Sequence, residues 1–201
     1  MRCIFCKSKS EESRTIEHII PESMGNLEHV LPAGVICDGC NHYFGRKVER
    51  PLLETSLFRH LRAGMQVQNK RGRIPYGEIT GSIEMPSYRL MGRFLAKVGL
   101  EVIAFKTLEV EDWNKEIVEN PVLDELRNYA RYNIGPDWPF KFRTLHPVNA
   151  IFSEGQELYE VLHEFNILVT KRQEFYIVLS LFGVEMVLNL GTRSLDGLRS
   201  G

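Results

Sequence analysis

The sequence lacks several features that would assign it to a specialised class of protein. It has only two tryptophans, and it contains no internal repeat and no low-complexity tract. Its longest apolar stretch, residues 175–190, is interrupted by polar residues and a glycine, so it does not have the character of a transmembrane helix. The first residues have no apolar core of the kind found in signal peptides. We therefore expect a soluble, cytoplasmic protein without a membrane partner.

The composition is that of an ordinary globular protein, but the charges are unevenly distributed. The chain has 201 residues, of which 43% are hydrophobic and 25% charged, which suits one core domain plus a small module. The net charge of −1 argues against a uniformly basic nucleic-acid binder. Residues 1–106 nevertheless carry 16 Lys and Arg against 11 Asp and Glu, whereas residues 107–201 carry 9 against 15. The two halves therefore have opposite electrostatic characters.

Basic residues are concentrated between positions 46 and 73. They are Arg46, Lys47, Arg50, Arg59, Arg62, Lys70, Arg71 and Arg73. Such a stretch is a candidate phosphate-facing surface. On charge alone, a solvated helix face followed by a charged turn is the more common explanation, and only a nearby site for a polyanion would favour the first interpretation.

Cysteine is absent from the last 161 residues, and all four cysteines lie within the first 40. They form two C-x-x-C pairs, Cys3 with Cys6 and Cys37 with Cys40, separated by 30 residues. Two such pairs match the ligand number and local spacing of a tetrahedral structural zinc site. Two disulfides are the alternative, but a reducing compartment favours metal. We therefore predict a structural Zn²⁺ that fastens a module too small to have a core of its own.

The segment between and after the cysteine pairs predicts a strand, a loop, a second strand and a helix. The first strand leads to Glu17-His18-Ile19-Ile20-Pro21, and Cys37-Asp38-Gly39-Cys40-Asn41 leads into the helix, with Asn41 as its N-cap. In this combination the residues resemble the HNH endonucleases, which have the ββα-metal fold. The resemblance covers roughly the first quarter of the chain, judged by the size of such a module.

The resemblance implies roles for three residues. Glu17 and Asn41 would hold one divalent ion, and His18 would act as general base toward the attacking water. Oxygen ligands of this kind suit Mg²⁺ or Mn²⁺ better than Zn²⁺. Because neighbouring residues of a strand point to opposite sides, Glu17 and His18 would need a local bend to share a site. His42 is a rival metal ligand, although its position relative to Cys40 favours Asn41.

The sequence departs from the family pattern at one position. The family often has an Asn five residues before the third cysteine, whereas this chain has Pro32 there. Asn26 and His29 are the alternatives for that role. Arg46 and Lys47, which follow Asn41 in the helix, are candidates for contacting the scissile or a neighbouring phosphate. We otherwise expect His29 and His60 at the surface and assign no role to His146 and His163.

The rest of the chain predicts an α+β protein, with a helical segment and a C-terminal antiparallel β meander after the ββα-metal module and its zinc-ribbon-like knuckles. Pro51 suggests a kink or a second helical start. Residues 65–68 and 79–84 alternate in polarity and predict a hairpin with a basic tip. We further expect helices at 88–105 and 121–132 and strands at 140–142, 161–170, 175–182 and 184–190. A helix at 157–165 is the alternative to the start of the first of these C-terminal strands.

This division gives a zinc-stapled nuclease module at 1–60, a basic hairpin at 61–85 and an α+β domain at 86–201. The predicted function is metal-dependent hydrolysis of DNA, in a setting such as restriction or phage defence. The acidic C-terminal half is a candidate surface for a regulatory protein partner, and a homodimer would make double-strand cutting simpler. The alternative is a non-catalytic zinc-ribbon module that binds nucleic acid or protein, which Pro32 favours.

Overall fold

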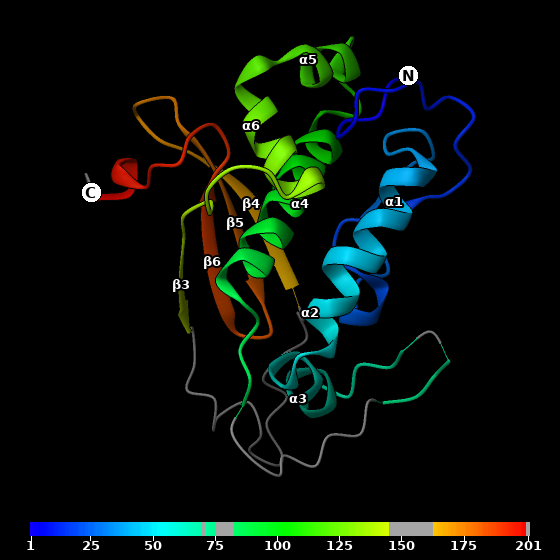
Figure 1. Ribbon diagram of the computed structural model, residues 1–201, viewed down its shortest axis with the longest axis vertical. Helices are drawn as coiled ribbons and strands as arrows, with labels where there is room; N and C mark the ends of the chain where they lie inside the picture. Colours follow the sequence, from blue (N-terminus) through cyan, green and yellow to red (C-terminus); the bar gives the residue numbers. More distant parts are fainter. Residues whose placement is uncertain (70, 75–82, 145–162, 200–201) are drawn as a thin grey trace.

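The computed structural model describes residues 1–69, 71–74, 83–144 and 163–199, which form three layers. A four-stranded antiparallel sheet lies on one side, the helix α4 (Tyr88–Thr107) covers its face, and the N-terminal module packs on the other side of α4 (Figure 1). The model confirms the expected mixture of helices and strands with a C-terminal antiparallel sheet. The middle layer α4 therefore touches both halves of the chain.

The N-terminal module has the predicted strand, loop, strand and helix order. Strand β1 (Glu17–His18) pairs with β2 (Val30–Leu31) in antiparallel register, and the short 3-10 helix η1 (Glu22–Met24) lies in the loop between them. Helix α1 (Asp38–Phe44) contains Cys40 and begins directly after Cys37. The two strands are only two residues long, so side-chain contacts contribute much of what fixes their position.

Helix α1 begins earlier than the sequence suggested. Its N-cap is Cys37, and the Cys40 and Asn41 amides both donate to the Cys37 carbonyl, at 2.9 and 3.0 Å. The C-x-x-C turn is thus itself the first turn of the helix. Asn41 lies inside the helix, so the prediction that it is the N-cap is wrong.

The helical segment continues beyond α1 with a break near the proline. A π-helical turn, η2 (Gly45–Glu49), joins α1 to α2 (Arg50–Glu54), in which Pro51 stands in the first turn. A proline cannot donate its backbone amide, and a π turn is one way a helix accommodates that loss. Thr55 is extended, and α3 (Ser56–Gly64) then starts in a new direction.

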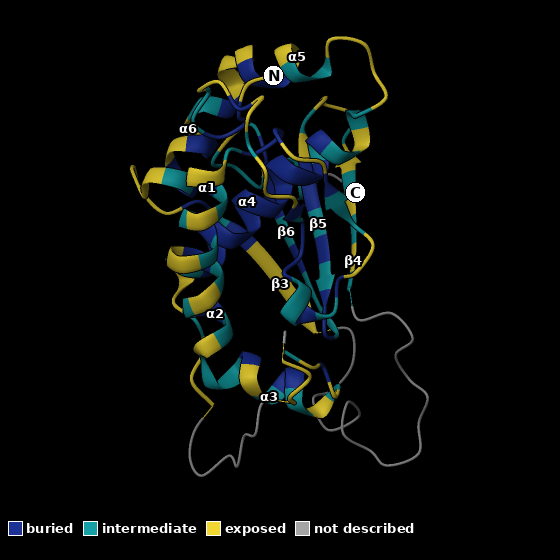
Figure 2. Ribbon diagram, turned by 90° about the vertical axis from the view of Figure 1, so that its right-hand side faces the viewer, coloured by how far each residue is buried: buried dark blue, intermediate teal, exposed yellow. Residues whose placement is uncertain are grey.

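Helix α4 is the structural centre of the molecule. It begins where the sequence predicted a helix, and its N-cap Ser87 accepts a hydrogen bond from the Leu90 amide at 3.2 Å. Figure 2 shows that most of α4 is buried, whereas α1 and α2 have exposed outer faces. At Gly99 the helix approaches the sheet so closely that a Cβ atom would collide with Leu190 and contact Ile177 tightly.

Two short helical segments cover one end of α4. Helix α5 (Trp113–Glu119), which the sequence analysis did not predict, precedes a continuous segment made of η3 (Pro121–Leu123), α6 (Asp124–Arg127) and the π turn η4 (Asn128–Tyr132). The side chain of Asn120 caps this segment by accepting from the Val122 amide at 3.0 Å. The helix expected at 121–132 is therefore present with a composite geometry.

The C-terminal sheet contains a meander and one added strand. Strands β4 (His163–Val169), β5 (Phe175–Leu181) and β6 (Val184–Asn189) follow one another, and β3 (Phe140–Thr144) pairs with β6 at the edge. The order is β3-β6-β5-β4. All four strands fall where the sequence predicted strands, and residues 163–165 are strand rather than helix.

Only part of the expected basic hairpin lies within the described residues. Helix α3 extends to Gly64, and residues 65–68 form a turn and irregular chain instead of the expected strand. A turn does form at the tip, where the Asn69 amide donates to the Arg73 carbonyl at 2.8 Å. Positions 75–82, which include most of the second expected strand, lie outside the described residues. The hairpin and the three-part division of the chain remain predictions.

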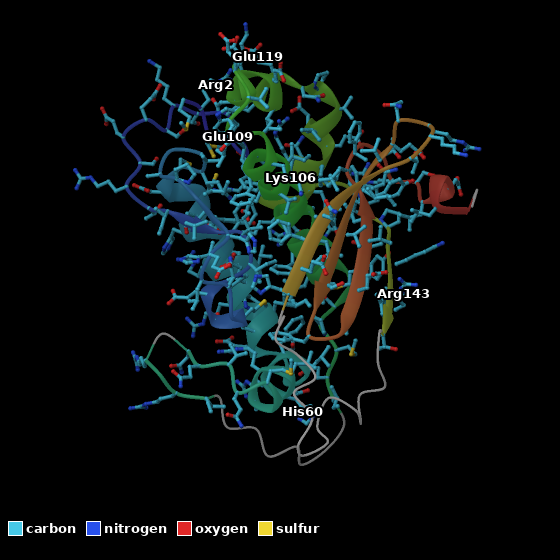
Figure 3. The ribbon with its side chains drawn as sticks, turned by 180° about the vertical axis from the view of Figure 1, so that it is seen from behind. Arg2, His60, Lys106, Glu109, Glu119 and Arg143 are labelled. Atoms are coloured by element: carbon cyan, nitrogen blue, oxygen red, sulfur yellow. The ribbon has the colours of Figure 1, made fainter. Side chains whose placement is uncertain are left out.

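The two halves share one hydrophobic core. Buried apolar side chains from the zinc module, α4, the composite helix and the sheet form one continuous cluster. At the end of the molecule where α5 lies, Arg2 approaches Glu119 at 3.8 Å (Figure 3), and Asn114 exchanges two hydrogen bonds with the Arg2 backbone. Within the described ranges, no helix combines the length and apolar character needed to cross a membrane.

Candidate active site

The four cysteines converge as the sequence predicted. Their Sγ atoms all lie within 4.8 Å of one another, and those of Cys6 and Cys37 are 3.6 Å apart. A tetrahedral ion with Zn–S bonds of about 2.3 Å would place its sulfur ligands about 3.8 Å apart, whereas a disulfide needs about 2.05 Å. The cysteines are free thiols in this arrangement, so their positions fit a zinc ion.

The thiols strongly influence one another. The Cys40 thiol donates a hydrogen bond to Cys3, which lowers the pKa of Cys3 to about 5, against the opposing effect of burial. The same hydrogen bond, followed by burial, raises the pKa of Cys40. Burial raises the pKa of Cys37 to about 11. Holding all four groups as thiolates therefore requires a cation among them, which a zinc ion would supply.

Residues outside the cysteine pairs support this site. Arg131, in η4, donates from Nε to the Cys40 sulfur at 3.2 Å, and its guanidinium lies 3.7 Å from the centre of the Tyr43 ring. Asp38 accepts hydrogen bonds from the Thr15 amide and hydroxyl at 3.0 and 2.7 Å. The cysteine turn therefore holds the chain that leads into β1, and the C-terminal half contributes a cation to the sulfur cluster.

Asn41 joins α1 to the start of β1. Its Nδ2 donates to the Ile16 carbonyl at 2.9 Å, one residue before Glu17. Because this bond uses the amide nitrogen, the side-chain oxygen is the atom left for another partner. This geometry suits the oxygen ligand that the family resemblance implies for Asn41.

His18 is half-buried beside this point. Among the described residues, its Nδ1 atom has no hydrogen-bond partner. Its strand partner is Val30. His42, the rival ligand, is exposed on α1.

Asn26 braces the loop between β1 and β2. It is fully buried, and its Nδ2 donates to the Ile20 and His29 carbonyls, both at 2.9 Å. Its Oδ1 accepts from the Glu28 and His29 amides at 3.2 and 2.9 Å. Of the two alternatives for the position occupied by Pro32, Asn26 is therefore the one whose side chain steadies the loop.

His29 has a different role, and its expected exposure is wrong. Its ring lies 4.8 Å from the Phe165 ring and 5.6 Å from the His163 ring, measured between centroids, and is partly buried between the halves. Asn26 therefore holds the loop backbone, and His29 contacts aromatic rings instead of lying at the surface as expected.

Glu17 points into the core, to the Lys97 ammonium. Its Oε1 atom lies 2.7 Å from Lys97 Nζ, and Glu49 Oε1 and Glu101 Oε2 lie 2.7 and 2.9 Å from the same nitrogen. Lys97 and Glu101 are completely buried, and Glu17 is 6% exposed. One carboxylate oxygen of Glu17 is therefore committed to an internal cation.

The buried charges shift one another's ionisation. Burial raises the pKa of Glu17, against the attraction of Lys97, and it raises the pKa of Glu101 well above its usual range. Burial alone would lower the pKa of Lys97, but the surrounding carboxylates outweigh it and raise that pKa well above its ordinary value. Lys97 is consequently a charged side chain at neutral pH.

Arg46 and Lys47 are exposed on η2, in the turn after α1. Of the other basic residues of this stretch, Arg50 is exposed and bonded to Glu54 at 2.8 Å, whereas Arg62 is buried, and burial lowers its pKa. The described basic residues of this stretch therefore do not form one continuous exposed face, and Arg62 is not part of the candidate phosphate-facing surface.

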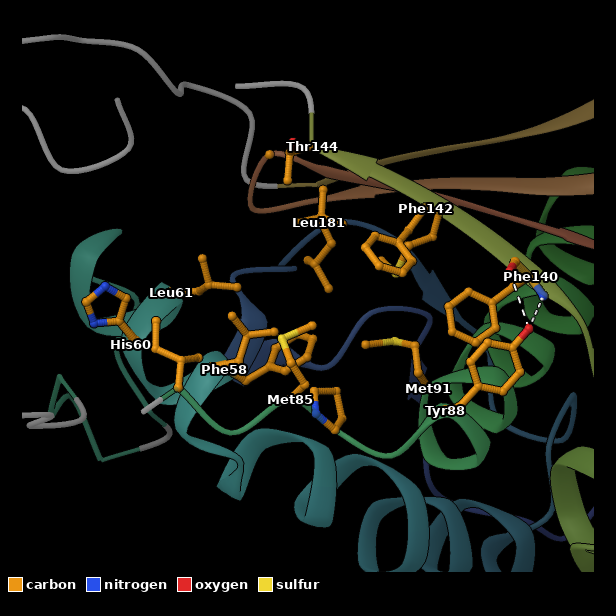
Figure 4. Close-up of a pocket in the computed structure, with 16 residues that line it drawn as sticks. Phe58, His60, Leu61, Met85, Tyr88, Met91, Phe140, Phe142, Thr144 and Leu181 are labelled. Atoms are coloured by element: carbon orange, nitrogen blue, oxygen red, sulfur yellow. Dashed lines mark hydrogen bonds between the residues drawn. The ribbon is translucent and has the colours of Figure 1, made fainter. Parts of the chain in front are cut away.

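An apolar cavity lies apart from these groups. It has a volume of about 480 Å³ and is formed by α3, the chain before α4, β3 and the β5–β6 turn (Figure 4). Phe58, Met85, Phe140 and Leu181 are among the side chains that line it. His60 stands at its edge rather than freely at the surface, which corrects the expectation for that residue. The cavity contains none of the motif residues.

Sequence reasoning missed Lys97, Glu49, Glu101 and Arg131. A signal for two of them was present, because Lys97 and Glu101 are charged residues four positions apart within a helix that is otherwise strongly apolar. Fully buried charged side chains are rare unless they are paired with each other. Arg131 gave no comparable signal, because its contact depends on how η4 folds back onto α1.

This geometry defines a small ββα unit with four clustered thiols that could hold a metal ion and with a Glu-His pair on its first strand. Residues 3–57 match the family model described as HNH endonuclease. The N-terminal region is thus an HNH region, which indicates nuclease activity and nucleic-acid binding in general, and nucleases of this family use divalent metals. No curated protein and no solved structure matches the chain.

Proposed function

We propose that the protein is a metal-dependent endonuclease that hydrolyses phosphodiester bonds in DNA. The observation that carries this proposal is the bond from Asn41 to the Ile16 carbonyl, within a region that matches the HNH family. It ties the helix residue expected to bind metal to the backbone of Ile16, the residue before Glu17. The donor set of one carboxylate and one amide oxygen suits Mg²⁺ or Mn²⁺, and the four thiolates suit Zn²⁺.

In this proposal His18 accepts a proton from water while the water oxygen attacks phosphorus and the bond to the leaving oxygen breaks. A neutral imidazole nitrogen can accept a proton from water, which is why histidine is a common general base. A divalent ion held by Glu17 and Asn41, when bound, supplies positive charge for the negative charge that develops on the phosphate and the leaving oxygen. Arg46 and Lys47, which are exposed on η2, would contact neighbouring phosphates.

The test is a plasmid-nicking assay with Mg²⁺ or Mn²⁺ and a chelator control. We expect His18→Ala to lower the cleavage rate by about 10²–10⁴-fold, because general-base catalysis contributes about that much. His42→Ala, one residue from Asn41 but exposed on α1, is the matched control and should cut normally. Zinc content and thermal unfolding should be unchanged in both variants.

If His18→Ala cleaves DNA as fast as the wild type, then either His18 takes no part in the mechanism or a contaminating nuclease cuts the DNA. A low rate in His42→Ala with a normal rate in Asn41→Ala would instead make His42 the ligand. If the wild type cleaves no DNA with either Mg²⁺ or Mn²⁺, the proposal of a metal-dependent endonuclease is wrong.

A non-catalytic zinc-ribbon module that binds nucleic acid or protein is the second candidate. The contact between Glu17 and Lys97 favours it, because a carboxylate paired with a buried ammonium has one oxygen fewer for a metal. Binding of a labelled duplex without any cleavage, together with no effect of Mn²⁺ on that binding, would support this candidate.

We further propose a cytoplasmic role in restriction or phage defence, with the acidic second half as a surface for a regulatory protein. That half carries 9 basic against 15 acidic residues. One ββα unit cuts one strand, so a homodimer would explain double-strand cutting. Light scattering at several protein concentrations, compared with the ratio of nicked to linear plasmid, tests the dimer.

A further inference from the structure

Lys97 lies outside the HNH region and yet reaches its motif. The family match ends at residue 57, whereas Lys97 is in α4. Its side chain has no exposed surface, and its ammonium lies 2.7 Å from Glu17, which directly precedes His18. A residue of α4, outside the HNH region, therefore holds the side chain next to the proposed general base.

Three elements meet at this ammonium. Glu17 comes from β1, Glu49 from η2, and Glu101 from α4 itself, one turn after Lys97. An ammonium in the interior is stable only when it is paired, and here each partner belongs to an element of the site or to the helix behind it. Strand β1 has two residues, so its own backbone pairing fixes little. The Glu17–Lys97 contact consequently anchors the point from which His18 projects.

We propose that Lys97 is a positioning residue of the nuclease centre, which holds Glu17 by one oxygen, leaves its other oxygen for a metal ion and fixes the short strand that carries His18. This inference rests on the proposed function. It makes α4 a working part of the site, and the HNH segment alone would then be incomplete.

A simple charge-balancing role for Lys97 predicts the opposite effect on metal binding. If Lys97 only offset negative charge, then removing its positive charge close to Glu17 would strengthen the binding of a divalent cation. If Lys97 positions Glu17, its removal weakens that binding, because residues that orient metal ligands are typically worth about 10–100-fold in affinity or activity. The sign of the change therefore separates the two roles.

The experiment uses the whole 201-residue chain loaded with zinc and compares Lys97→Met with the wild type. Mn²⁺ binding is measured by electron paramagnetic resonance, and cleavage is measured over a range of plasmid and Mn²⁺ concentrations. We expect the Mn²⁺ dissociation constant to rise by about 10–100-fold and kcat to fall, with KM for DNA unchanged. Arg93→Met is the matched control, because Arg93 is a buried cation one turn earlier in α4 that bonds to the Ala130 carbonyl and the Tyr43 hydroxyl.

Arg93→Met should lower the thermal stability while leaving Mn²⁺ affinity close to that of the wild type. Unchanged or tighter Mn²⁺ binding in Lys97→Met, with normal cleavage by the folded protein, would overturn the positioning role and leave the nuclease proposal standing. If the wild type neither binds Mn²⁺ nor cuts DNA, both the nuclease proposal and the role of Lys97 fail.

A second variant covers the case in which Lys97→Met does not fold. Lys97→Met combined with Glu101→Gln removes the ammonium together with one buried carboxylate, so fewer uncompensated charges remain in the interior. We expect the same loss of Mn²⁺ affinity in this double variant, while Glu101→Gln alone retains it. If the double variant binds Mn²⁺ as tightly as Glu101→Gln alone, the inference is refuted.

Discussion

Replacing Asn26 by Ala tests whether the loop between β1 and β2 organises the candidate active site. The Asn26 side chain is fully buried and makes four hydrogen bonds, two to the Ile20 and His29 carbonyls and two from the Glu28 and His29 amides. Alanine removes all four. The Ile20 carbonyl is buried, so water cannot simply take the place of the amide.

The expected loss of stability follows from this count. Each hydrogen bond contributes about 1 kcal/mol net, so the variant should lose about 4 kcal/mol of unfolding free energy. For a chain of this size, 1 kcal/mol corresponds to about 2–4 °C in Tm, which gives a fall of about 8–16 °C. Because the loop follows His18 directly, we also expect a cleavage rate per folded molecule at least about 10-fold lower, which is the effect of a 1.4 kcal/mol rise in the barrier.

Asn189→Ala provides a matched control in the other half of the chain. Asn189 is also buried and braces a loop, donating to the Ser194 carbonyl at 2.9 Å and accepting from the Gly191 and Thr192 amides at 2.9 and 3.1 Å. Its replacement should cost about 3 kcal/mol for three lost bonds, with no change in cleavage per folded molecule.

Thermal unfolding and plasmid nicking are measured on both variants, with the rates corrected for the folded fraction. The reasoning is refuted if Asn26→Ala loses less than about 1 kcal/mol, or if both variants lose cleavage to the same extent. The first result would mean that the loop bonds are replaced by water at no cost. The second would mean that activity follows global stability and not the geometry of this loop.

Two further predictions concern the zinc site and the contact between the halves. Cys37→Ser should lose zinc and its cooperative thermal transition, as measured by metal analysis and calorimetry; a variant that keeps both would disprove the structural role of the ion. Burial, followed by the nearby His29, lowers the pKa of His163, with a smaller opposing effect of Glu28. The unfolded chain therefore takes up this proton more readily, and stability falls as the pH drops below about 6.5. His163→Phe should lose less stability than the wild type between pH 7.5 and 5.5 in urea titrations, and an equal loss would contradict this assignment.

Sequence alone predicted those features that depend on neighbouring residues. The C-x-x-C turns, the helix that begins at position 88 and the strands 175–181 and 184–189 rest on local spacing, polarity and turn residues, and the structure has them. The fold class followed from the order of these elements. The HNH resemblance was equally local, because its motif residues all lie between positions 3 and 41.

Features that depend on distant segments were missed or left open. The choice between Asn26 and His29 required the path of the loop, because either side chain could have reached its own neighbouring backbone. The N-cap assignment of Asn41 failed because the cysteine turn became the first turn of α1, an outcome set by four thiols meeting rather than by helix-capping preferences. Asn41 was thereby turned toward Ile16, which lies 25 positions earlier in the chain.

The same reasoning explains why the two halves share one hydrophobic core. Helix α4 packs against the sheet on one side. On its other side, Lys97 forms ion pairs with Glu17 and Glu49 of the N-terminal module. Separating the halves would expose apolar surface and leave three carboxylates without their shared cation, and both changes are unfavourable. The N-terminal module is small and has little core of its own, so the buried ammonium and the apolar face of α4 supply what the four cysteines alone do not, a fixed position for the strand that carries His18.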